Sequence, residues 1–223
     1  MKEKTLKISE IFYSFQGEST LMGTPTLFIR LQGCNLKCKI CDTKHSWGKK
    51  HKIISCKEIL KIAVKTKAPF VCITGGEPLL QTKELLPLIK GLLKLKKIIS
   101  IETNGSVSIK KIPINVKRVI DVKTPSTGFK TSFKKDNLKY LTNYDEVKFV
   151  ISNKADFEFA EKFIQKNNLN KTGCTILMSP NLAKKGLANK LVNWMLKSGQ
   201  QYIFQPQLHK LIKEKPINLI KRS

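Results

Sequence analysis

Three cysteines stand within eight residues, in the segment Cys34-Asn35-Leu36-Lys37-Cys38-Lys39-Ile40-Cys41. Their C-x3-C-x2-C spacing points to a metal centre, because a disulfide scaffold would be shorter and denser in cysteine. Three closely spaced thiolates can hold three irons of a cubane cluster and leave the fourth iron open. The alternative is a structural zinc site with His45 or His51 as fourth ligand, although zinc sites usually comprise two separated pairs.

Short apolar segments bounded by turn residues surround this loop. Residues 26–31 are predicted to form a strand that leads into the cysteines, and residues 70–74 form a second strand that stops at Gly75-Gly76. Further strand candidates are 98–102, 118–122, 146–151, 174–178 and 202–205. Runs of this kind are typical of strands that are buried on both faces of a parallel sheet.

Helical patterns separate these strands. Ser55-Cys56-Lys57-Glu58 is a capping box that opens a helix to about residue 65. A second helix extends to about residue 95, and Pro87 predicts a break or a late start in it. Asn153 is a candidate cap for a helix over 154–165, and another helix covers about 186–197. The alternation predicts an α/β fold with a parallel sheet, in one domain over residues 1–223. Residues 106–145 are expected to be irregular apart from one strand.

Polar and glycine residues follow the predicted strands. In parallel α/β folds, functional groups gather at the carboxyl ends of the strands. Here those ends are Gly33-Cys34, Thr74-Gly75-Gly76-Glu77, Glu102-Thr103-Asn104, Asp121-Val122-Lys123 and Met178-Ser179-Pro180. The sequence therefore predicts one active-site face on a single rim of the sheet.

The net charge of the 223-residue chain is +26, and this charge bears on possible partners. Three of the 42 basic residues are arginine, and the other 39 are lysines spread over nearly every segment. Specific phosphate and base recognition favours the forked guanidinium of arginine. We therefore expect no specific nucleic-acid site, only non-specific attraction at low salt. No segment reaches the ~20 apolar residues of a membrane helix, and no apolar run follows the charged N-terminus, so a cytoplasmic protein is expected.

Several longer motifs accompany the cysteine loop. They are Glu10-Ile11-Phe12-Tyr13-Ser14-Phe15-Gln16-Gly17-Glu18, Phe28-Ile29-Arg30-Leu31-Gln32-Gly33-Cys34-Asn35, Cys41-Asp42-Thr43, Thr74-Gly75-Gly76-Glu77-Pro78, Ile101-Glu102-Thr103-Asn104-Gly105, Asp121-Val122-Lys123-Thr124-Pro125 and Gln207-Leu208-His209-Lys210. In this order, from residue 7 to residue 210, they resemble the 7-carboxy-7-deazaguanine synthase family of the radical S-adenosylmethionine (SAM) superfamily. The resemblance implies an open parallel β/α barrel of about six strands.

The resemblance also implies a reaction. The family binds a 4Fe–4S cluster, here through Cys34, Cys38 and Cys41, and cleaves SAM on it to methionine and a 5′-deoxyadenosyl radical. The radical abstracts hydrogen from carbon 6 of 6-carboxy-5,6,7,8-tetrahydropterin. Ring contraction with loss of ammonia then gives 7-carboxy-7-deazaguanine, a precursor in queuosine biosynthesis. Because the cofactor performs the difficult step, few general acid–base residues are expected. An electron donor such as flavodoxin or ferredoxin, and a homodimer, are implied as well.

The site residues are assigned by position in the family motifs. The SAM contacts fall on Ile40, Cys41, Asp42, Gly75, Gly76, Glu77, Glu102, Asn104, Asp121, Val122, Lys123, Met178, Ser179, Pro180 and Asn181. The substrate contacts fall on Phe15, Gln16, Gly17, Glu18, Arg30, Thr74 and His209. Glu18 is suited to accept paired N–H bonds from a pterin, and Arg30 to grip a carboxylate with its fork. Thr43 is the Mg²⁺ position, and the ion needs further oxygens from water or substrate.

Two other functions remain open at this point. A glycyl-radical activating enzyme shares the C-x3-C-x2-C loop, but it leaves Gln16-Gly17-Glu18 and Cys41-Asp42-Thr43 unexplained. A non-catalytic, zinc-stabilised RNA-binding protein is suggested by the charge and by the nearby histidines. The remaining thiols, Cys56, Cys72 and Cys174, lie in apolar segments and are predicted to be buried without a cofactor role.

Overall fold

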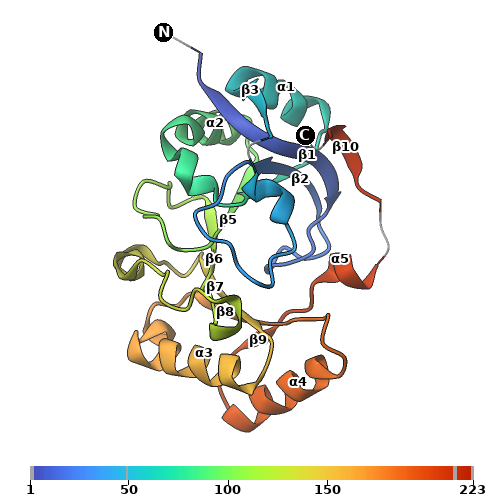
Figure 1. Ribbon diagram of the computed structural model, residues 1–223. Helices are drawn as coiled ribbons and strands as arrows, with labels where there is room; N and C mark the ends of the chain where they lie inside the picture. Colours follow the sequence, from blue (N-terminus) through green and yellow to red (C-terminus); the bar gives the residue numbers. More distant parts are fainter. Residues whose placement is uncertain (1–2, 49, 213–214, 222–223) are drawn as a thin grey trace.

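Seven parallel strands of one mixed sheet bring their carboxyl ends to the same edge (Figure 1). They are β2 (Pro25–Leu31), β4 (Phe70–Gly75), β5 (Ile98–Thr103), β6 (Lys117–Asp121), β7 (Glu146–Ile151), β8 (Thr175–Pro180) and β9 (Ile203–Phe204). Each strand pairs in parallel with the next in that order. The computed structural model describes residues 3–48, 50–212 and 215–221. The α/β class and the strand positions predicted from the sequence are confirmed.

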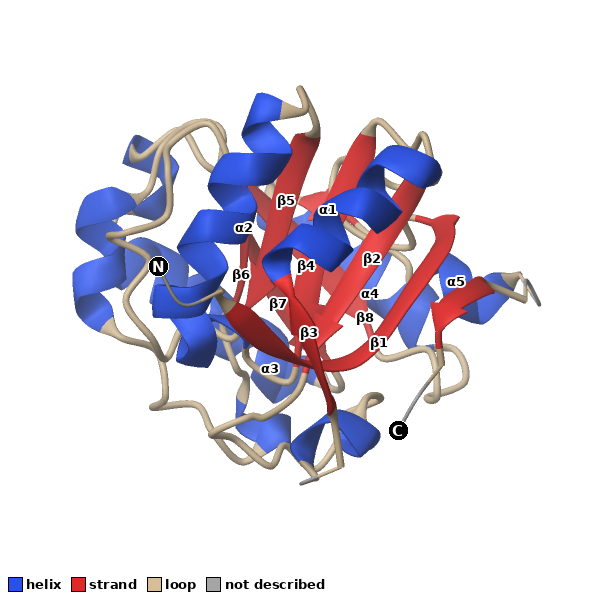
Figure 2. Cartoon of the chain, turned by 90° about the horizontal axis from the view of Figure 1, so that it is seen from above, coloured by secondary structure: helices blue, strands red, loops and turns tan. Residues whose placement is uncertain are grey.

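Three strands extend the sheet beyond β2, and the sequence did not predict them. β1 (Thr5–Phe15) pairs antiparallel with β2. β3 (Lys52–Ser55) and β10 (Ile217–Ile220) pair antiparallel with successive parts of β1, as the red arrows of Figure 2 show for β1 and β3. The sheet thus ends in β9 on one side and in β10 on the other, so the barrel is open.

Loop contacts bridge the opening of the barrel where strand pairing stops. The backbone N–H of Leu208 donates to the Gly17 carbonyl oxygen at 2.9 Å. The Gln205 side-chain amide donates to the Ser19 carbonyl oxygen at 2.8 Å, and both residues are buried. The loop between β1 and β2 is therefore tied to the segment that follows β9.

Four helices pack on the outside of the curved sheet (Figure 1): α1 (Cys56–Lys65), α2 (Thr82–Lys94), α3 (Lys154–Lys166) and α4 (Leu187–Ser198). The predicted caps are present, since Ser55 Oγ accepts from the Glu58 N–H at 3.2 Å and Asn153 Oδ1 from the Asp156 N–H at 2.9 Å. One apolar core lies under α1 and α2, and a second lies under α3 and α4. No helix in the described part of the chain is long and apolar enough to cross a membrane.

The predicted break at Pro87 was wrong, because α2 continues through it from Thr82 to Lys94. Pro87 is exposed, while Leu85, Leu88 and Leu92 on the opposite face are fully buried. Burial of that apolar face stabilises the helix enough to tolerate the hydrogen bond that proline cannot make. Apart from β6, residues 106–145 are irregular, as predicted, with short 3-10 turns at Pro125–Thr127 and Lys135–Tyr140.

Arg118 on β6 forms a buried ion pair that anchors this irregular segment. Its Nε donates to Asp145 Oδ1 at 2.7 Å and its terminal nitrogen to Oδ2 at 2.5 Å. Asp145 also accepts from the backbone N–H of Thr142 at 2.7 Å, so one carboxylate fixes the turn before β7. The two-pronged geometry explains arginine in a chain that otherwise uses lysine.

Candidate active site

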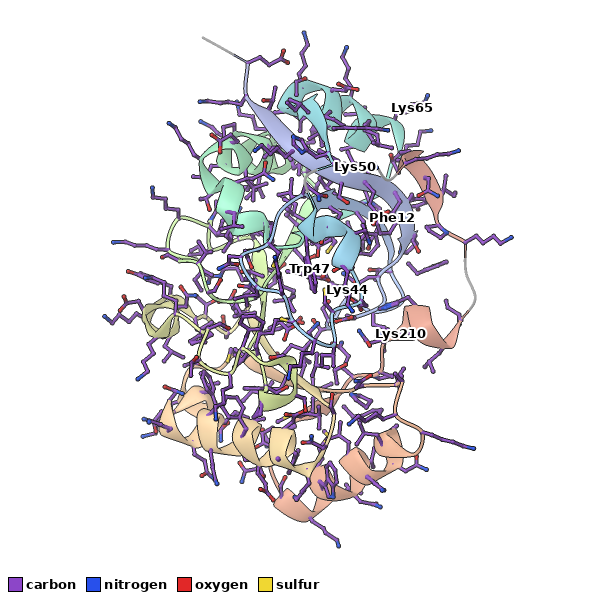
Figure 3. The ribbon with its side chains drawn as sticks, viewed as in Figure 1. Phe12, Lys44, Trp47, Lys50, Lys65 and Lys210 are labelled. Carbon is purple, nitrogen blue, oxygen red and sulfur yellow. The ribbon has the colours of Figure 1, made fainter. Side chains whose placement is uncertain are left out.

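A cavity of about 430 Å³ opens at the carboxyl ends of the parallel strands, where the sequence predicted the functional face. Three residues of its wall, Phe12, Trp47 and Lys210, are labelled in Figure 3. The structure brings most of the predicted residues to this wall, namely Phe15, Gln16, Gly17, Glu18, Arg30, Cys34, Cys38, Ile40, Cys41, Asp42, Thr43, Thr74, Gly75, Gly76, Glu102, Asn104, Asp121, Lys123, Asn181 and His209.

The cysteine loop faces the cavity with three unpaired thiols, Cys34, Cys38 and Cys41. Cys34 Sγ accepts from the backbone N–H of Leu36 at 3.4 Å and lies 3.9 Å from the Asn104 side-chain amide. Burial raises the pKa of the Cys34 and Cys38 thiols, and the Lys123 ammonium acts in the opposite direction. Hydrogen bonds to sulfur and a nearby cation suit thiolates that bind a cluster.

A zinc site is not formed by these residues. Among the described residues, no three His, Cys, Asp or Glu side chains are arranged to hold one metal ion. His45 turns its Nε2 toward Glu10 Oε1, at 3.2 Å. A cubane needs no such convergence, because each thiolate binds a different iron. The geometry therefore fits the cluster and leaves the zinc alternative unsupported.

The glycine motif packs directly against the end of β2 and the start of the cysteine loop. A Cβ atom at Gly76 would lie 2.4 Å from the Gly33 carbonyl oxygen and 2.6 Å from Cys34 Cβ, and one at Gly75 would lie 2.5 Å from the Leu31 carbonyl oxygen. The Glu77 N–H donates to the Gly33 carbonyl oxygen at 2.8 Å. The glycines thus allow the loops after β2 and β4 to touch, while both still reach the cavity wall.

Five residues assigned to SAM binding lie behind the wall: Glu77, Val122, Met178, Ser179 and Pro180, all of them buried. The Glu77 carboxylate accepts from Thr103 Oγ1 at 2.8 Å and from the Asn104 N–H at 2.7 Å. Burial raises the pKa of Glu77, although these donors oppose the shift. Glu77 therefore fixes the loop that carries Asn104. Contact of these five residues with SAM stays a prediction.

Charged side chains meet on the other side of the cavity. Glu18 accepts from Gln207 Nε2 at 2.7 Å and forms a close ion pair with Lys148. The Lys148 Nζ is also 3.6 Å from Asp121 Oδ2, which receives Lys123 Nζ at 2.8 Å. Burial alone would raise the pKa of Glu18, but Lys148 and the hydrogen bond from Gln207 lower it to about 2. The pocket thus holds an ionised carboxylate next to fixed cations.

A second hydrogen-bonded set is centred on Glu102 of β5. Thr74 Oγ1 donates to Glu102 Oε2 at 3.0 Å, and Gln16 Nε2 donates to Oε1 at 3.4 Å. The Gln16 Oε1 in turn accepts from the Glu18 N–H at 3.1 Å. Cys72 Sγ, buried as predicted, also lies 3.4 Å from Glu102 Oε1. Glu102 therefore orients the substrate-side residues Thr74 and Gln16 in addition to any contact with a cofactor.

Arg30, the predicted carboxylate-binding residue, is held from both sides. Its Nε donates to Glu10 Oε1 at 2.8 Å, and its guanidinium carbon lies 5.8 Å from the centre of the Phe12 ring. Phe12 itself stacks on Phe28, with ring centres 4.7 Å apart. Both rings line the cavity. The fork of Arg30 is thus oriented by Glu10 and Phe12 at the cavity wall.

The segment after β9 completes the wall. His209 lies so close to the loop after β1 that a Cβ at Gly17 would be 2.3 Å from its Nδ1. Lys210 binds the Gln207 side chain and lies 3.6 Å from Asp42 Oδ2 in the cysteine loop. Pro216, just before β10, also lines the cavity. Pro216, beyond the last quoted motif, therefore belongs to the same cavity wall as His209 and Lys210.

Sequence reasoning missed several residues of the wall, among them Phe12, Phe28, Trp47, Lys148 and Gln207. Lys148 is at the centre of a predicted strand and alternates with apolar neighbours. Because successive side chains of a strand point to opposite faces, this alternation was the sequence signal that Lys148 faces the inside of the barrel. Gln207 and Phe12 lay inside quoted motifs, but nothing distinguished their roles. Their functions depend on contacts across the open side of the barrel, which local sequence does not encode.

Comparisons with known proteins agree with this geometry. The model of the Radical SAM superfamily matches residues 28–180. A 7-carboxy-7-deazaguanine synthase of Koribacter versatilis is 35% identical over 93% of this chain and 96% of its own length. One from Methanospirillum hungatei is 41% identical over 93% of this chain and 85% of its own. The crystal structure of QueE from Escherichia coli superposes with a TM-score of 0.78 at 25% identity, covering 92% of this chain and 95% of that chain.

Proposed function

Because the chain belongs to the 7-carboxy-7-deazaguanine synthase family of the radical SAM superfamily, we propose that it converts 6-carboxy-5,6,7,8-tetrahydropterin to 7-carboxy-7-deazaguanine with loss of ammonia. The reaction serves queuosine and related deazapurine biosynthesis. The observation that carries the proposal is the shared cavity, where the cysteine loop and the glycine motif face Glu18 and Arg30. A glycyl-radical activating enzyme is not favoured, since it would act on a protein and would leave the Glu18 and Arg30 side of this cavity without a use.

The residues present fit the cofactors of the superfamily. Cys34, Cys38 and Cys41 would hold the 4Fe–4S cluster, which supplies the electron that cleaves SAM. Asp121 Oδ1 is buried at the wall without a hydrogen-bond partner among the described residues. A buried acceptor without a hydrogen-bond partner destabilises the fold unless a donor group of a ligand reaches it. This supports a place for SAM beside Asp121. Asn104 and the backbone of the glycine motif complete that side of the pocket.

The substrate would occupy the opposite side. Glu18 is ionised and able to accept N–H bonds from the amino-pyrimidinone edge, and Arg30 is oriented to receive the carboxylate. Thr74 and Gln16, fixed by Glu102, would contact the ring polar groups, and His209 closes the pocket. Thr43 would supply one Mg²⁺ oxygen, with the remaining ligands from substrate and water.

The decisive test is anaerobic turnover of cluster-reconstituted protein with SAM, a reductant, Mg²⁺ and 6-carboxytetrahydropterin, read out by mass spectrometry. We expect 7-carboxy-7-deazaguanine, and none from Cys38→Ala. If 5′-deoxyadenosine appears without that product, the substrate assignment is wrong while the radical SAM assignment stands. If neither appears although the cluster is intact, the proposed reaction is wrong as a whole.

An acidic one-electron carrier, such as a flavodoxin or a ferredoxin, is the electron donor we propose. Lys37 and Lys39 in the cysteine loop, and Lys44 and Lys50 shortly after it in the sequence, are exposed, and Asp42 is the exposed acidic residue among them. A cationic rim of this kind accelerates encounter with an anionic partner and does so less at high salt. Reversing Lys37, Lys39 and Lys44 to glutamate should slow reduction by the protein donor but not by dithionite. Equal slowing with both reductants would contradict a docking role.

We also propose a homodimer and a cytoplasmic location. Exposed apolar side chains, Ile53, Ile217 and Leu219, lie on β3 and β10, which both flank β1 and offer an edge for a second copy. Light scattering after gel filtration tests this, and Ile217→Lys should yield monomer if the edge is the interface. The six free thiols support a reducing compartment, which cell fractionation can test.

A further inference from the structure

A buried lysine lies at the centre of the substrate side of the cavity without an assigned role. Lys148, in the middle of β7, pairs with the carboxylate of Glu18 and lies 3.6 Å from Asp121 Oδ2. The side chains of Lys148 and Glu18 are only 9% and 13% exposed. A lysine so enclosed is kept charged only by its partners, since burial without them would neutralise it.

Glu18 is gripped from a second direction by Gln207. The Gln207 Nε2 donates to Glu18 Oε1 at 2.7 Å, while Lys148 takes Oε2, so each carboxylate oxygen has its own donor. The Lys210 ammonium holds the other end of the Gln207 amide. Three elements distant in sequence, the loop after β1, the strand β7 and the segment before α5 (Leu208–Leu211), therefore converge on one carboxylate.

We propose that Lys148 is a positioning residue for the substrate, which acts by orienting the Glu18 carboxylate and keeping it available as an acceptor of substrate N–H bonds. The inference rests on the proposed function, because Glu18 is the group that would bind the pterin edge. Each carboxylate oxygen has two acceptor sites, so a single donor on each, Lys148 on Oε2 and Gln207 on Oε1, leaves one site per oxygen for the substrate. Lys148 thus fixes the direction of the remaining lone pairs.

The groups that face this pair explain why a cation is needed there. Glu18 is surrounded by Lys148 on β7, by Gln207 and by His209, and Lys148 is influenced by Asp121 on β6 and Glu102 on β5. Without Lys148, the largely buried Glu18 would lose the cation that forms its ion pair, and the hydrogen bond from Gln207 would remain. Burial would then raise its pKa above the ordinary value of 4.5, whereas in the intact site the pKa is about 2. A protonated Glu18 would have lost acceptor capacity at the moment of binding.

The alternative role for Lys148 is direct contact with the substrate, since it also lines the cavity. The two roles differ in their coupling to Glu18. If Lys148 acts through Glu18, its removal has little further effect once Glu18 is a neutral amide, so the double variant resembles Glu18→Gln alone. If Lys148 binds the substrate itself, the two losses multiply.

The test compares Lys148→Met with Lys148→Arg by steady-state kinetics on reconstituted holoenzyme between pH 6 and pH 8.5. We expect Lys148→Met to raise KM for 6-carboxytetrahydropterin at pH 6 by roughly tenfold or more, the cost of leaving a buried charged group without its partner. That rise should shrink as the pH increases and Glu18 ionises. Lys148→Arg keeps the charge and should restore the dependence of KM on pH that the parent enzyme shows.

Lys117→Met is the matched control. Lys117 on β6 forms a comparable buried pair with Glu146, at 3.1 Å, but lies outside the cavity wall. It should change stability and leave KM unchanged. A KM for Lys148→Met within twofold of the parent enzyme at pH 6, or multiplicative losses with Glu18→Gln, would overturn the proposal.

Two further measurements keep the test decisive. If Lys148→Met does not fold, Lys148→Gln replaces it, because its amide can still donate to Glu18 without supplying charge, and the same pH-dependent KM is expected. Formation of 5′-deoxyadenosine in the absence of pterin reports on the cluster and SAM independently. If the parent enzyme lacks 7-carboxy-7-deazaguanine production altogether, the proposed function has failed, and not the role of Lys148.

Discussion

Gly76→Ala should disrupt the cluster site through packing alone. The added Cβ would lie 2.4 Å from the Gly33 carbonyl oxygen and 2.6 Å from Cys34 Cβ. The first contact is backbone, so the loop after β2 must move as a whole and carry Cys34 with it. Overpacking of this kind costs about 1–3 kcal/mol. For a chain of this length that corresponds to a loss of roughly 2–12 °C in Tm.

Gly48→Ala is the matched control in the same loop region. Gly48 has φ −68°, which any residue adopts, and an added Cβ would have no neighbour closer than 3.8 Å. The assay is thermal unfolding of the apo protein, followed by iron and sulfide content after reconstitution. We expect Gly76→Ala to lose both stability and cluster occupancy, and Gly48→Ala to lose neither. Normal Tm and full cluster content in Gly76→Ala would refute the packing argument.

Arg118→Lys cannot reproduce the two-pronged bond to Asp145 and should cost about 3 kcal/mol, measured by urea unfolding. The pKa of Glu18 is lowered in the folded state, so the ionised carboxylate stabilises the fold by at most about 3 kcal/mol above pH 4.5, and this stabilisation is lost as the pH falls toward 2. The difference in unfolding free energy between the parent protein and Glu18→Gln should therefore shrink over this pH range. A difference that stays constant with pH would contradict the prediction. Cys38→Ser should abolish the 4Fe–4S absorption, whereas Cys174→Ser, whose thiol is buried in the second apolar core, should retain it.

Much of the parallel sheet was predictable because each strand carries its own signal. The segments before Gly75 and before Asn104 are mostly apolar and end in turn residues. The position of each strand, and the functional residues at its carboxyl end, could therefore be predicted from the local sequence. β1 was missed although Leu6, Ile8 and Ile11 are buried in it. The antiparallel pairing of β1 with β2, β3 and β10 depends on partners up to the far end of the chain, and no local pattern specifies such partners.

The site shows the same division between local and long-range information. The cysteine motif and the glycine motif each occupy a few consecutive residues. Their chemical roles can therefore be predicted from one short segment of sequence. The charge pair of Glu18 with Lys148 joins residues 130 positions apart, and Lys148 is one of 39 lysines that look alike in the sequence. Only burial separates it from the solvated ones.

The open barrel explains why these distant contacts collect on the substrate side. A closed barrel satisfies its edge strands by pairing, but here β9 and β10 are the ends of the sheet and never meet. The gap is spanned by Gly17, Ser19 and Glu18 against the segment after β9, through backbone and side-chain hydrogen bonds. Residues that span this gap, which we call the seam, also line the pocket. A substitution at the seam should therefore alter both substrate affinity and fold stability. The cysteine side is tied through β2 and β4 instead, so substitutions at the seam should leave cluster binding intact.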